Sequence, residues 1–432
     1  YLRTAALQDG LLDLSEMTTT PMRMPRGVAP YLYGGAFVDH LVDRHGVEAV
    51  TQFIRDYGRR LVPFAMNHLA RRHFGSDFPT LYARFLETVR EQSQAVAASV
   101  AQQGLVEGTP LTVEGEFHRH PMFTRDGLAI LYSQSDGHDT PGIFRQDRAT
   151  KRISRVIDCK GGCGQVSLSP DGRYAYLTHL EYHRLYYLFG DVYRVDLWTG
   201  EEVRLTRRAR ARDVSVAPDG TILFVTSEYD RVSVVRLDPV TNRRSTVIEA
   251  GLFSVIDHPH ALGDGRVVFA AARNGQWDLF AAVPGQAPVA LTNDRAMDRD
   301  VHLSPDERTV FFASDRGGIF NIHALDLGTG DVRKLTNVLT GAFWPAVSPD
   351  GHTLVFALYG SQGYDLALMD LDAAGNLPLP AAATPEASPS PLPALALPPA
   401  TVDDYSPWPS LRPRSLRPRY AFSTRELARL GA

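Results

Sequence analysis

A short turn phrase, Ser-Pro-Asp-Gly or a close variant, returns six times along this chain and constrains the fold more than any other feature. Proline favours a type I turn, aspartate can accept hydrogen bonds within it, and glycine suits the positive φ that follows. An alternating apolar pattern, typical of a half-buried strand, follows the turn. The turn aspartates are 45, 48, 45, 42 and 44 residues apart, at Asp126, Asp171, Asp219, Asp264, Asp306 and Asp350.

Repeats of this length are typical of four-stranded propeller blades, so the spacing predicts a six-bladed β-propeller. A Leu-Thr pair keeps the same register in four of the units. The last unit lacks its outer strand, whereas a surplus strand-like stretch precedes the first unit. We therefore expect residues 109–116 to supply the outer strand of the last blade, which would remove an exposed sheet edge.

The rest of the chain has a different character. Residues 1–106 carry apolar residues at helical spacing and predict a helical subdomain, which precedes the propeller at 107–376. Residues 377–402 are rich in proline and alanine, which predicts an extended linker, and 403–432 form a basic, aromatic tail. The predicted fold is mainly β: a six-bladed β-propeller with an N-terminal α-helical subdomain and a Pro-rich C-terminal linker.

Composition narrows the function classes. The formal net charge is −4, which argues against a nucleic-acid-binding protein. The sequence has no apolar run of about 18 residues, so we expect no transmembrane helix. The chain opens without methionine and already in helical register, so we expect it to be part of a longer protein. The lack of a visible signal peptide is then uninformative.

The best candidate site follows from the repeat itself. Six residues before each turn aspartate, the chain is expected to enter the innermost strand beside the central channel. These positions are occupied by His120, Gln165, Asp213, His258, Asp300 and Trp344. The residues just before four of them are charged, namely Arg119, Arg212, Asp257 and Arg299. They could form a polar ring at the channel mouth that holds an ion, a water cluster or a peptide end, or they could simply line a water-filled funnel.

Two other clusters have a structural and a chemical interpretation. His179, Glu181 and His183 would share one face of a strand, either as a metal site or, as we expect, at a solvated blade edge. Cys159 and Cys163 are close enough in sequence for a disulfide, but two free thiols in a loop are equally compatible with the spacing. Two cysteines are too few ligands for a structural zinc site.

One copy of the turn departs from the pattern. Glu307 stands where the other turns have glycine. If the backbone keeps a positive φ at this position, the substitution costs on the order of 1 kcal/mol. We interpret the repeated turn as scaffold rather than as a source of chemistry.

The stretch LTNDRAMDRDVHLSPDERTVFFASDRGGIFNIHALDL resembles the repeat of TolB-type β-propellers, with Leu-Thr, Ser-Pro-Asp and F-x-S-D-R-x-G in the same order. The resemblance covers about residues 109–375. It implies a six-bladed ring in the bacterial cell envelope that binds proteins or peptides and has no catalytic residues. Related propellers gate substrate access in proteases, but no G-x-S-x-G nucleophile motif follows in this sequence.

The helical segment, through YLYGGAFVDHLVDRHG, resembles the C-terminal part of gluzincin-type zinc metallopeptidase domains. The H-E-x-x-H motif of that family is absent from this sequence, so no catalytic or metal-binding residue is predicted here. The resemblance implies no cofactor in this chain, and zinc only in an upstream domain. The tail YSPWPSLRPR resembles the segment that leads into a surface-antigen-type outer-membrane barrel, which would follow in the full-length protein.

Three functional hypotheses follow. The first is a non-catalytic protein- or peptide-binding propeller of a bacterial cell-envelope protein, located in the periplasm. The alternative is the substrate-positioning propeller of a gluzincin metallopeptidase whose metal site lies upstream of Tyr1. The third is a structural spacer between a periplasmic domain and a barrel. The sequence upstream of this chain would distinguish the first two.

Overall fold

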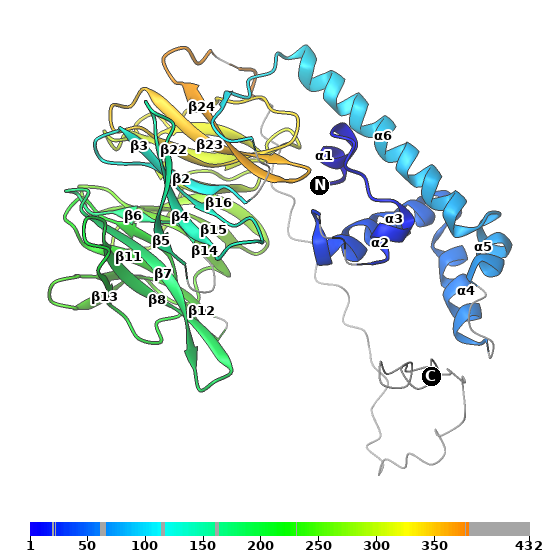
Figure 1. Ribbon diagram of the computed structural model, residues 1–432, viewed down its shortest axis with the longest axis horizontal. Coiled ribbons are helices and arrows are strands. Elements are labelled where there is room, and N and C mark those ends of the chain that lie inside the picture. The colour runs from blue at the N-terminus through cyan, green and yellow to red at the C-terminus, as the bar shows by residue number, and fades with distance from the viewer. Residues whose placement is uncertain are drawn as a thin grey trace, which may run out of the picture. The chain divides into compact units, whose positions relative to one another are not determined.

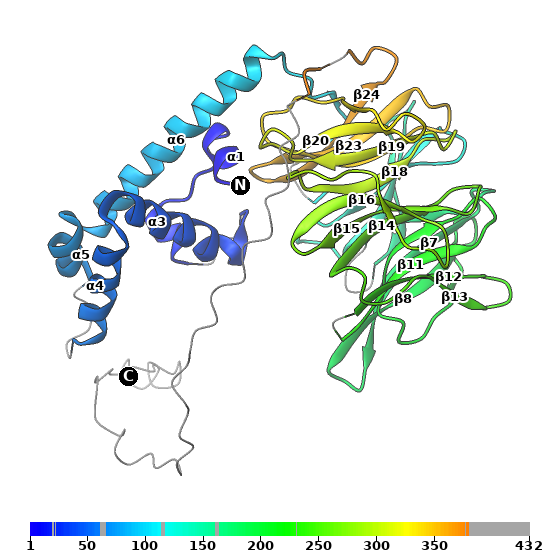
Figure 2. The same ribbon diagram turned by 180° about the vertical axis from the view of Figure 1, so that it is seen from behind.

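In the computed structural model the chain forms two compact units. One unit holds the strands together with residues 3–10 and the described residues between 93 and 379, and the other is formed by residues 11–92. Figures 1 and 2 show the strands and the helices from opposite sides. The structure describes residues 1–19, 21, 23–60, 66–113, 117–159, 164–229, 231–375 and 377–379.

The strand unit is a six-bladed β-propeller, as the repeat predicted. Each blade is a four-stranded antiparallel sheet. Three sheets are β2 (Arg119–Phe123), β3 (Ala129–Gln134), β4 (Gly142–Asp147) and β5 (Ile153–Asp158); β6 (Ser167–Leu168), β7 (Tyr174–His183), β8 (Tyr187–Asp196) and β9 (Glu202–Arg204); and β10 (Ala211–Val216), β11 (Ile222–Glu228), β12 (Arg231–Leu237) and β13 (Arg244–Ile248).

The next two sheets continue this order along the chain. They are β14 (Val255–Ala261), β15 (Val267–Arg273), β16 (Gln276–Ala282) and β17 (Val289–Ala290); and β18 (Asp298–Leu303), β19 (Thr309–Ser314), β20 (Asn321–Asp326) and β21 (Val332–Lys334). The first strands of successive blades contact one another, with β14 between β10 and β18, and β22 between β18 and β2. The innermost strands therefore surround a common axis.

The sixth sheet joins the two ends of the propeller. It contains β22 (Ala342–Val347), β23 (Thr353–Gly360) and β24 (Gly363–Asp370), with β1 (Thr109–Pro110) as its outer strand. Thr109 and Pro110 pair with Leu368 and Ala367 of β24. The strand that precedes the first blade thus covers the edge of the last one, where an unpaired edge would invite aggregation.

The second strand of each blade is buried on both faces between neighbouring blades. In β15 every residue from Val267 to Ala272 is buried, and Phe269, Phe312 and Phe356 are fully inaccessible in three successive blades. A strand covered on both sides needs a continuous apolar run rather than alternation. The core therefore consists of inter-blade layers, and the axis is left to the first strands of the blades.

The repeated Leu-Thr pair has a structural role at the end of the outer strand in the blades that carry it. The Thr206 hydroxyl accepts a hydrogen bond from the Val192 backbone N–H at 2.9 Å and donates to Asp191 at 2.8 Å. Thr336 makes the equivalent contacts with Ile322 and Asn321. The threonine side chain continues the sheet pairing where the outer strand ends, which explains why it keeps register with the turns.

The Ser-Pro-Asp-Gly turns are scaffold. In the last blade the Ser348 hydroxyl donates to Asp350, whose carboxylate also accepts from the His352 N–H at 3.1 Å. Gly351 has φ +82°, and Glu307 at the corresponding position of the fifth blade has φ +60°. The side chain of Glu307 accepts a hydrogen bond from the Gly263 N–H of the preceding blade at 2.7 Å. This inter-blade contact offsets part of the strain.

The other unit is helical and has its own aromatic core. Phe37 packs edge-on against Tyr82, and Phe53 packs in the same way against Phe78. The backbone of Leu12 is held by the hydroxyls of Tyr33 and Tyr82. Among the described residues, the helices are α1 (Leu2–Leu7), α2 (Leu14–Met17), the 3₁₀ turn η1 (Arg26–Val28), α3 (Ala29–His45), α4 (Val47–Gly58), α5 (Met66–Phe74) and α6 (Phe78–Gln102).

Within the part of the chain that the structure describes, no helix has the length and apolar character needed to cross a bilayer. The predicted linker at 377–402 lies outside the described residues except for 377–379, and the tail at 403–432 lies wholly outside them.

Candidate ligand-binding site in the central cavity

The six positions that lie six residues before the turn aspartates are here called the channel ring, and five of them share an unusual backbone conformation. In five blades the pairing register between the first and second strands shifts at this point, which is the signature of a β-bulge. The bulged residue adopts a left-handed conformation although none is glycine, with φ between +45° and +58° at His120, Asp213, His258, Asp300 and Trp344. Gln165 lies in the segment just before β6.

A left-handed conformation costs a non-glycine residue about 1–2 kcal/mol. Five such residues at equivalent positions therefore represent a repeated structural cost. Bulges re-aim side chains and are common beside functional sites. Here they direct the side chains of different blades toward the common axis, so that the His120 ring lies 4.6 Å from Trp344 and 6.0 Å from His258.

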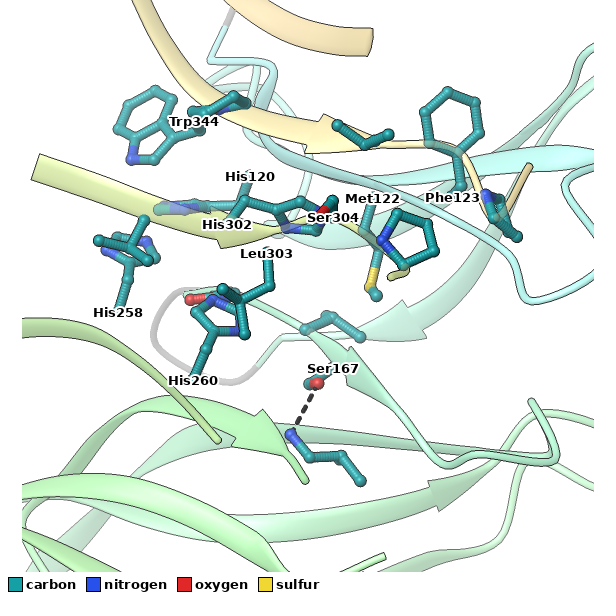
Figure 3. A pocket seen from close by; sticks show the side chains of 18 of the residues that line it. His120, Met122, Phe123, Ser167, His258, His260, His302, Leu303, Ser304 and Trp344 are labelled. Atoms are coloured by element: carbon teal, nitrogen blue, oxygen red, sulfur yellow. Dashed lines mark hydrogen bonds between the residues drawn. The ribbon is translucent and has the colours of Figure 1, made fainter. Parts of the chain in front are cut away.

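A cavity of about 450 Å³ lies along the axis (Figure 3). Five members of the channel ring line it, whereas Asp213 does not, and neither do Arg119, Arg212 and Arg299. The cavity extends to the turn side of the propeller, where it is lined by four exposed turn prolines, Pro170, Pro218, Pro305 and Pro349. Of the ring members that line the cavity, Asp300 and His258 are buried, at 1 % and 6 % exposed, whereas His120, Gln165 and Trp344 are half-buried.

The spacing rule did not select two further histidines in the cavity. His260 and His302 lie two residues beyond His258 and Asp300 on β14 and β18, with ring centroids 5.8 Å apart. Burial, helped by neighbouring histidines, lowers the pKa of His260 to about 3; burial and Arg125 lower that of His302 to about 4. Both are neutral at pH 7. Alternation along a strand, which returns every second residue to one face, is the signal that would have indicated them.

The inner end of the cavity carries a network of charges. Nδ1 of His258 lies 2.8 Å from Oδ1 of Asp257. Burial opposes a charge on His258, but the carboxylates of Asp257, Asp213 and Asp300 outweigh it and raise its pKa to about 9. Burial also disfavours the Asp257 carboxylate, and His258 and Arg299 more than compensate, so its pKa is lowered. His258 is thus an imidazolium and Asp257 a carboxylate at neutral pH.

Two of the arginines that precede ring positions, Arg212 and Arg299, act as counter-ions behind the ring. Nε of Arg299 lies 3.1 Å from Asp300, and its terminal nitrogen lies 3.7 Å from Asp257. Arg212 forms an ion pair with Asp213. Burial nevertheless raises the pKa of both Asp213 and Asp300.

One group of side chains has ligand atoms close enough together for a metal ion. The ligand atoms of Asp257, His258 and Asp300 lie within 4.8 Å of one another. However, the guanidinium of Arg299 already contacts both carboxylates. The ring therefore carries its own positive charge where a cation would otherwise be needed.

Several buried polar atoms of the residues that line the cavity lack a hydrogen-bond partner. Among the described residues, His120 Nδ1, Gln165 Oε1 and His260 Nε2 have no hydrogen-bond partner. Burial, together with the positive charges of His258 and Arg119, lowers the pKa of His120 well below its ordinary value, so its ring is neutral. Unsatisfied buried polar atoms are costly, and a ligand that pairs with them recovers that cost.

The His179–His183 segment is held by local contacts rather than brought together as a site. His179 is fully buried, so the prediction of a solvated blade edge is wrong for this residue. Its Nε2 lies 2.5 Å from a carboxylate oxygen of Glu202. Glu181 accepts from the Tyr193 hydroxyl at 2.5 Å and pairs with Arg204 at 3.2 Å. The strand presents these residues to separate partners within one blade.

Cys159 is buried beside the first inter-blade core and is disulfide-bonded. The only other cysteine in the sequence, Cys163, lies outside the described residues.

Fold and cavity together define a six-bladed β-propeller with a polar axial site. No protein-family model matches the chain. It is 27 % identical to a "Protein TolB homolog" of Chlorobium luteolum over 147 residues, which is 34 % of this chain and 33 % of that protein. It is 24 % identical to the uncharacterized protein Atu1656 of Agrobacterium fabrum over 219 residues, 48 % of this chain and 72 % of that protein.

Solved structures with a similar arrangement include two TolB proteins. The putative TolB of Agrobacterium tumefaciens gives a TM-score of 0.47 at 16 % identity and covers 60 % of this chain and 93 % of its own. TolB of Acinetobacter baumannii gives 0.47 at 19 % identity, with 66 % and 67 % covered. The sequence similarity to the Chlorobium TolB homolog makes the propeller TolB-like, as its repeat predicted. The match to the Chlorobium protein spans only about a third of that protein's length.

Proposed function

We propose that this chain is the non-catalytic, protein- or peptide-binding part of a bacterial cell-envelope protein, and that a peptide segment enters the central cavity. The observation that carries the proposal is the cavity itself. Its volume of about 450 Å³ is in the range of small-ligand sites, and its inner end combines a charged histidine with unpaired polar atoms.

The chemistry of the lining suits a peptide better than a purely apolar or a purely ionic ligand. Met122, Phe123 and Leu303 provide apolar wall, and the turn prolines continue it. The charged His258 donates hydrogen bonds, whereas Gln165 Oε1 can only accept them. A peptide backbone offers both donors and acceptors, so it can satisfy both kinds of group at once.

A selection experiment tests the proposal. The full chain is presented to a display library of random peptides, and enriched peptides are titrated against His258→Gln and against the matched control His138→Gln, which changes an exposed histidine. We expect at least a tenfold loss of affinity for the first variant and no loss for the control. Failure to enrich any sequence, or equal binding to both variants, would contradict the proposal.

The proposal also includes the cellular location of the chain and the domains beside it in the full-length protein. The TolB-like propeller supports a periplasmic location, and the tail's resemblance supports a barrel that follows. In the rival proposal the helical segment belongs to a zinc metallopeptidase for which the propeller positions substrate. The sequence that precedes Tyr1 in the gene decides between them, because an H-E-x-x-H motif followed by a glutamate ligand there would favour the peptidase.

A further inference from the structure

One hairpin projects from the propeller and has no part in the cavity. Strands β7 and β8 have ten residues each, whereas β3 and β4 of the preceding blade have six. Figures 1 and 2 both show this hairpin extending beyond its neighbours. The structure pairs His183 with Tyr187, which leaves Arg184, Leu185 and Tyr186 as the connecting loop.

The end of this hairpin is rich in exposed aromatic and aliphatic side chains. Tyr182, Leu185 and Tyr186 are 76 %, 84 % and 86 % exposed, and Tyr187 and Leu188 are 56 % and 48 % exposed. Tyr229, at the end of the adjacent β11–β12 hairpin, is 96 % exposed. We call these six residues the hairpin tip. Such a cluster marks an interaction surface more often than it is left in water.

Arginines lie directly beside the hairpin tip. The loop between β9 and β10 exposes Arg207, Arg208 and Arg210. The Arg210 guanidinium lies 4.5 Å from the Phe189 ring and 6.0 Å from the Tyr229 ring, and the Arg208 backbone N–H donates to Asp191 at 3.0 Å. These contacts hold the basic loop against the hairpin.

Acidic groups near the hairpin tip are mostly engaged. Arg204 pairs with both Glu181 and Asp191, and Asp191 is fully buried. Glu228 is exposed and lies opposite Arg231 in the strand register, so it is outnumbered by the arginines of the β9–β10 loop, and Asp230 lies outside the described residues. The patch is therefore positive, although the whole chain has a formal net charge of −4.

We propose that the hairpin tip and its arginines dock on an anionic phospholipid bilayer. Interfacial membrane anchors typically combine tyrosine and leucine with nearby arginine. Their aromatic rings enter the headgroup region, and their cations pair with lipid phosphates. The apolar residues lie at the end of a projecting hairpin, a convex shape that a fluid surface accepts without a matching pocket. Both the electrostatic attraction of the arginines to anionic lipids and the burial of the apolar side chains strengthen binding to such a surface.

Vesicle co-sedimentation of the full chain tests this inference. The probes are vesicles of phosphatidylcholine alone and of equal parts phosphatidylcholine and phosphatidylglycerol. One variant combines Leu185→Ser with Tyr186→Ser, and another combines Arg207→Ala with Arg208→Ala. Val240→Ser, at a position that is 91 % exposed, and Arg243→Ala with Arg244→Ala are the matched controls in a different turn.

We expect binding to the anionic vesicles that weakens in high salt, with a loss of at least tenfold for each hairpin-tip or arginine variant and none for the controls. Thermal melting of each variant checks that the fold is retained. Absence of binding to anionic vesicles would overturn the inference. So would an equal loss in the controls, or binding to polyglutamate but not to vesicles, which would indicate an acidic protein partner instead.

Discussion

Nδ1 of His258 and Oδ1 of the adjacent Asp257 lie 2.8 Å apart at the inner end of the cavity. Adjacent side chains on a regular strand point to opposite faces, so this contact depends on the bulge at His258, where φ is +45°. The same bulge places the imidazole within reach of the Asp300 and Asp213 charges. One local backbone feature therefore sets the charge state of the candidate site.

The first prediction concerns the titration of His258. Its pKa is raised to about 9 in the folded protein, compared with about 6.5 for an unperturbed histidine. Protonation of His258 therefore makes its full contribution to the stability of the fold below pH 6.5, and this contribution is lost as the pH rises through 9. A histidine-selective NMR titration, assigned by comparison with His258→Gln, should show a midpoint near 9; a midpoint near 6.5 would contradict the charge network.

A second prediction concerns a buried cluster between the fourth and fifth blades. A terminal nitrogen of Arg316 lies 2.8 Å from Asp294 and 3.1 Å from Asp298, and its side chain is 6 % exposed. Replacing Arg316 with methionine leaves buried carboxylates without a counter-ion, which costs about 3–5 kcal/mol. Urea unfolding measures the loss. The exposed Arg266–Asp264 pair is the control, and Arg266→Met should cost less than about 1 kcal/mol.

The same cluster predicts a pH dependence of stability. Burial raises the pKa of Asp298 to about 7 and that of Asp278 to about 6, although Arg316 and the Thr292 hydroxyl act in the opposite direction. Because the folded protein holds these protons more tightly than the unfolded chain does, protonation of the two carboxyls stabilises the fold fully below pH 3.8. This contribution is lost as the pH rises through 7. Between pH 5 and 8 the melting temperature of wild type should fall more steeply than that of Asp298→Asn; parallel curves would count against the shift.

Glu307 offers a test of backbone strain. At φ +60° an alanine keeps the strained backbone but loses the carboxylate that accepts from Gly263, so Glu307→Ala should destabilise by about 1–2 kcal/mol. Glu307→Gly loses the same contact but relieves the strain, and should be about 1 kcal/mol more stable than the alanine variant. Chemical denaturation of both variants gives the comparison, and an alanine variant equal to or better than the glycine variant would show that the turn is unstrained.

The repeat allowed much of the fold to be predicted from sequence, because the turn that joins the two inner strands fixes their register. Counting back from Asp264 and Asp306 therefore reached His258 and Asp300 on the bulges themselves. The same rule could not indicate that both residues are bulged, since nothing in the residue types demands a positive φ. The surplus segment at Thr109 could be recognised because the last unit lacked an outer strand.

The electrostatics of the site could not be predicted in the same way. Arg299 is charged as the pattern indicated, but it lies behind the ring, where it balances Asp300 and Asp257 rather than lining the cavity. His260 and His302 were not predicted, because only one position in each innermost strand was selected as a candidate site residue. Helical periodicity likewise could not show that residues 3–10 and 93–102 group with the propeller, since that depends on long-range contacts such as Asn337 with Val100.

Trp344 provides the most direct test of the central claim that the cavity binds a peptide. Its ring lies 4.6 Å from His120 in the lining, whereas Trp198 is 78 % exposed outside the cavity. The fluorescence of the full chain is followed while a display-selected peptide is added. A saturable change that disappears in Trp344→Phe, remains in Trp198→Phe and needs at least tenfold more peptide in His258→Gln is the predicted result. A change that survives in Trp344→Phe, with unaltered affinity in His258→Gln, would contradict it.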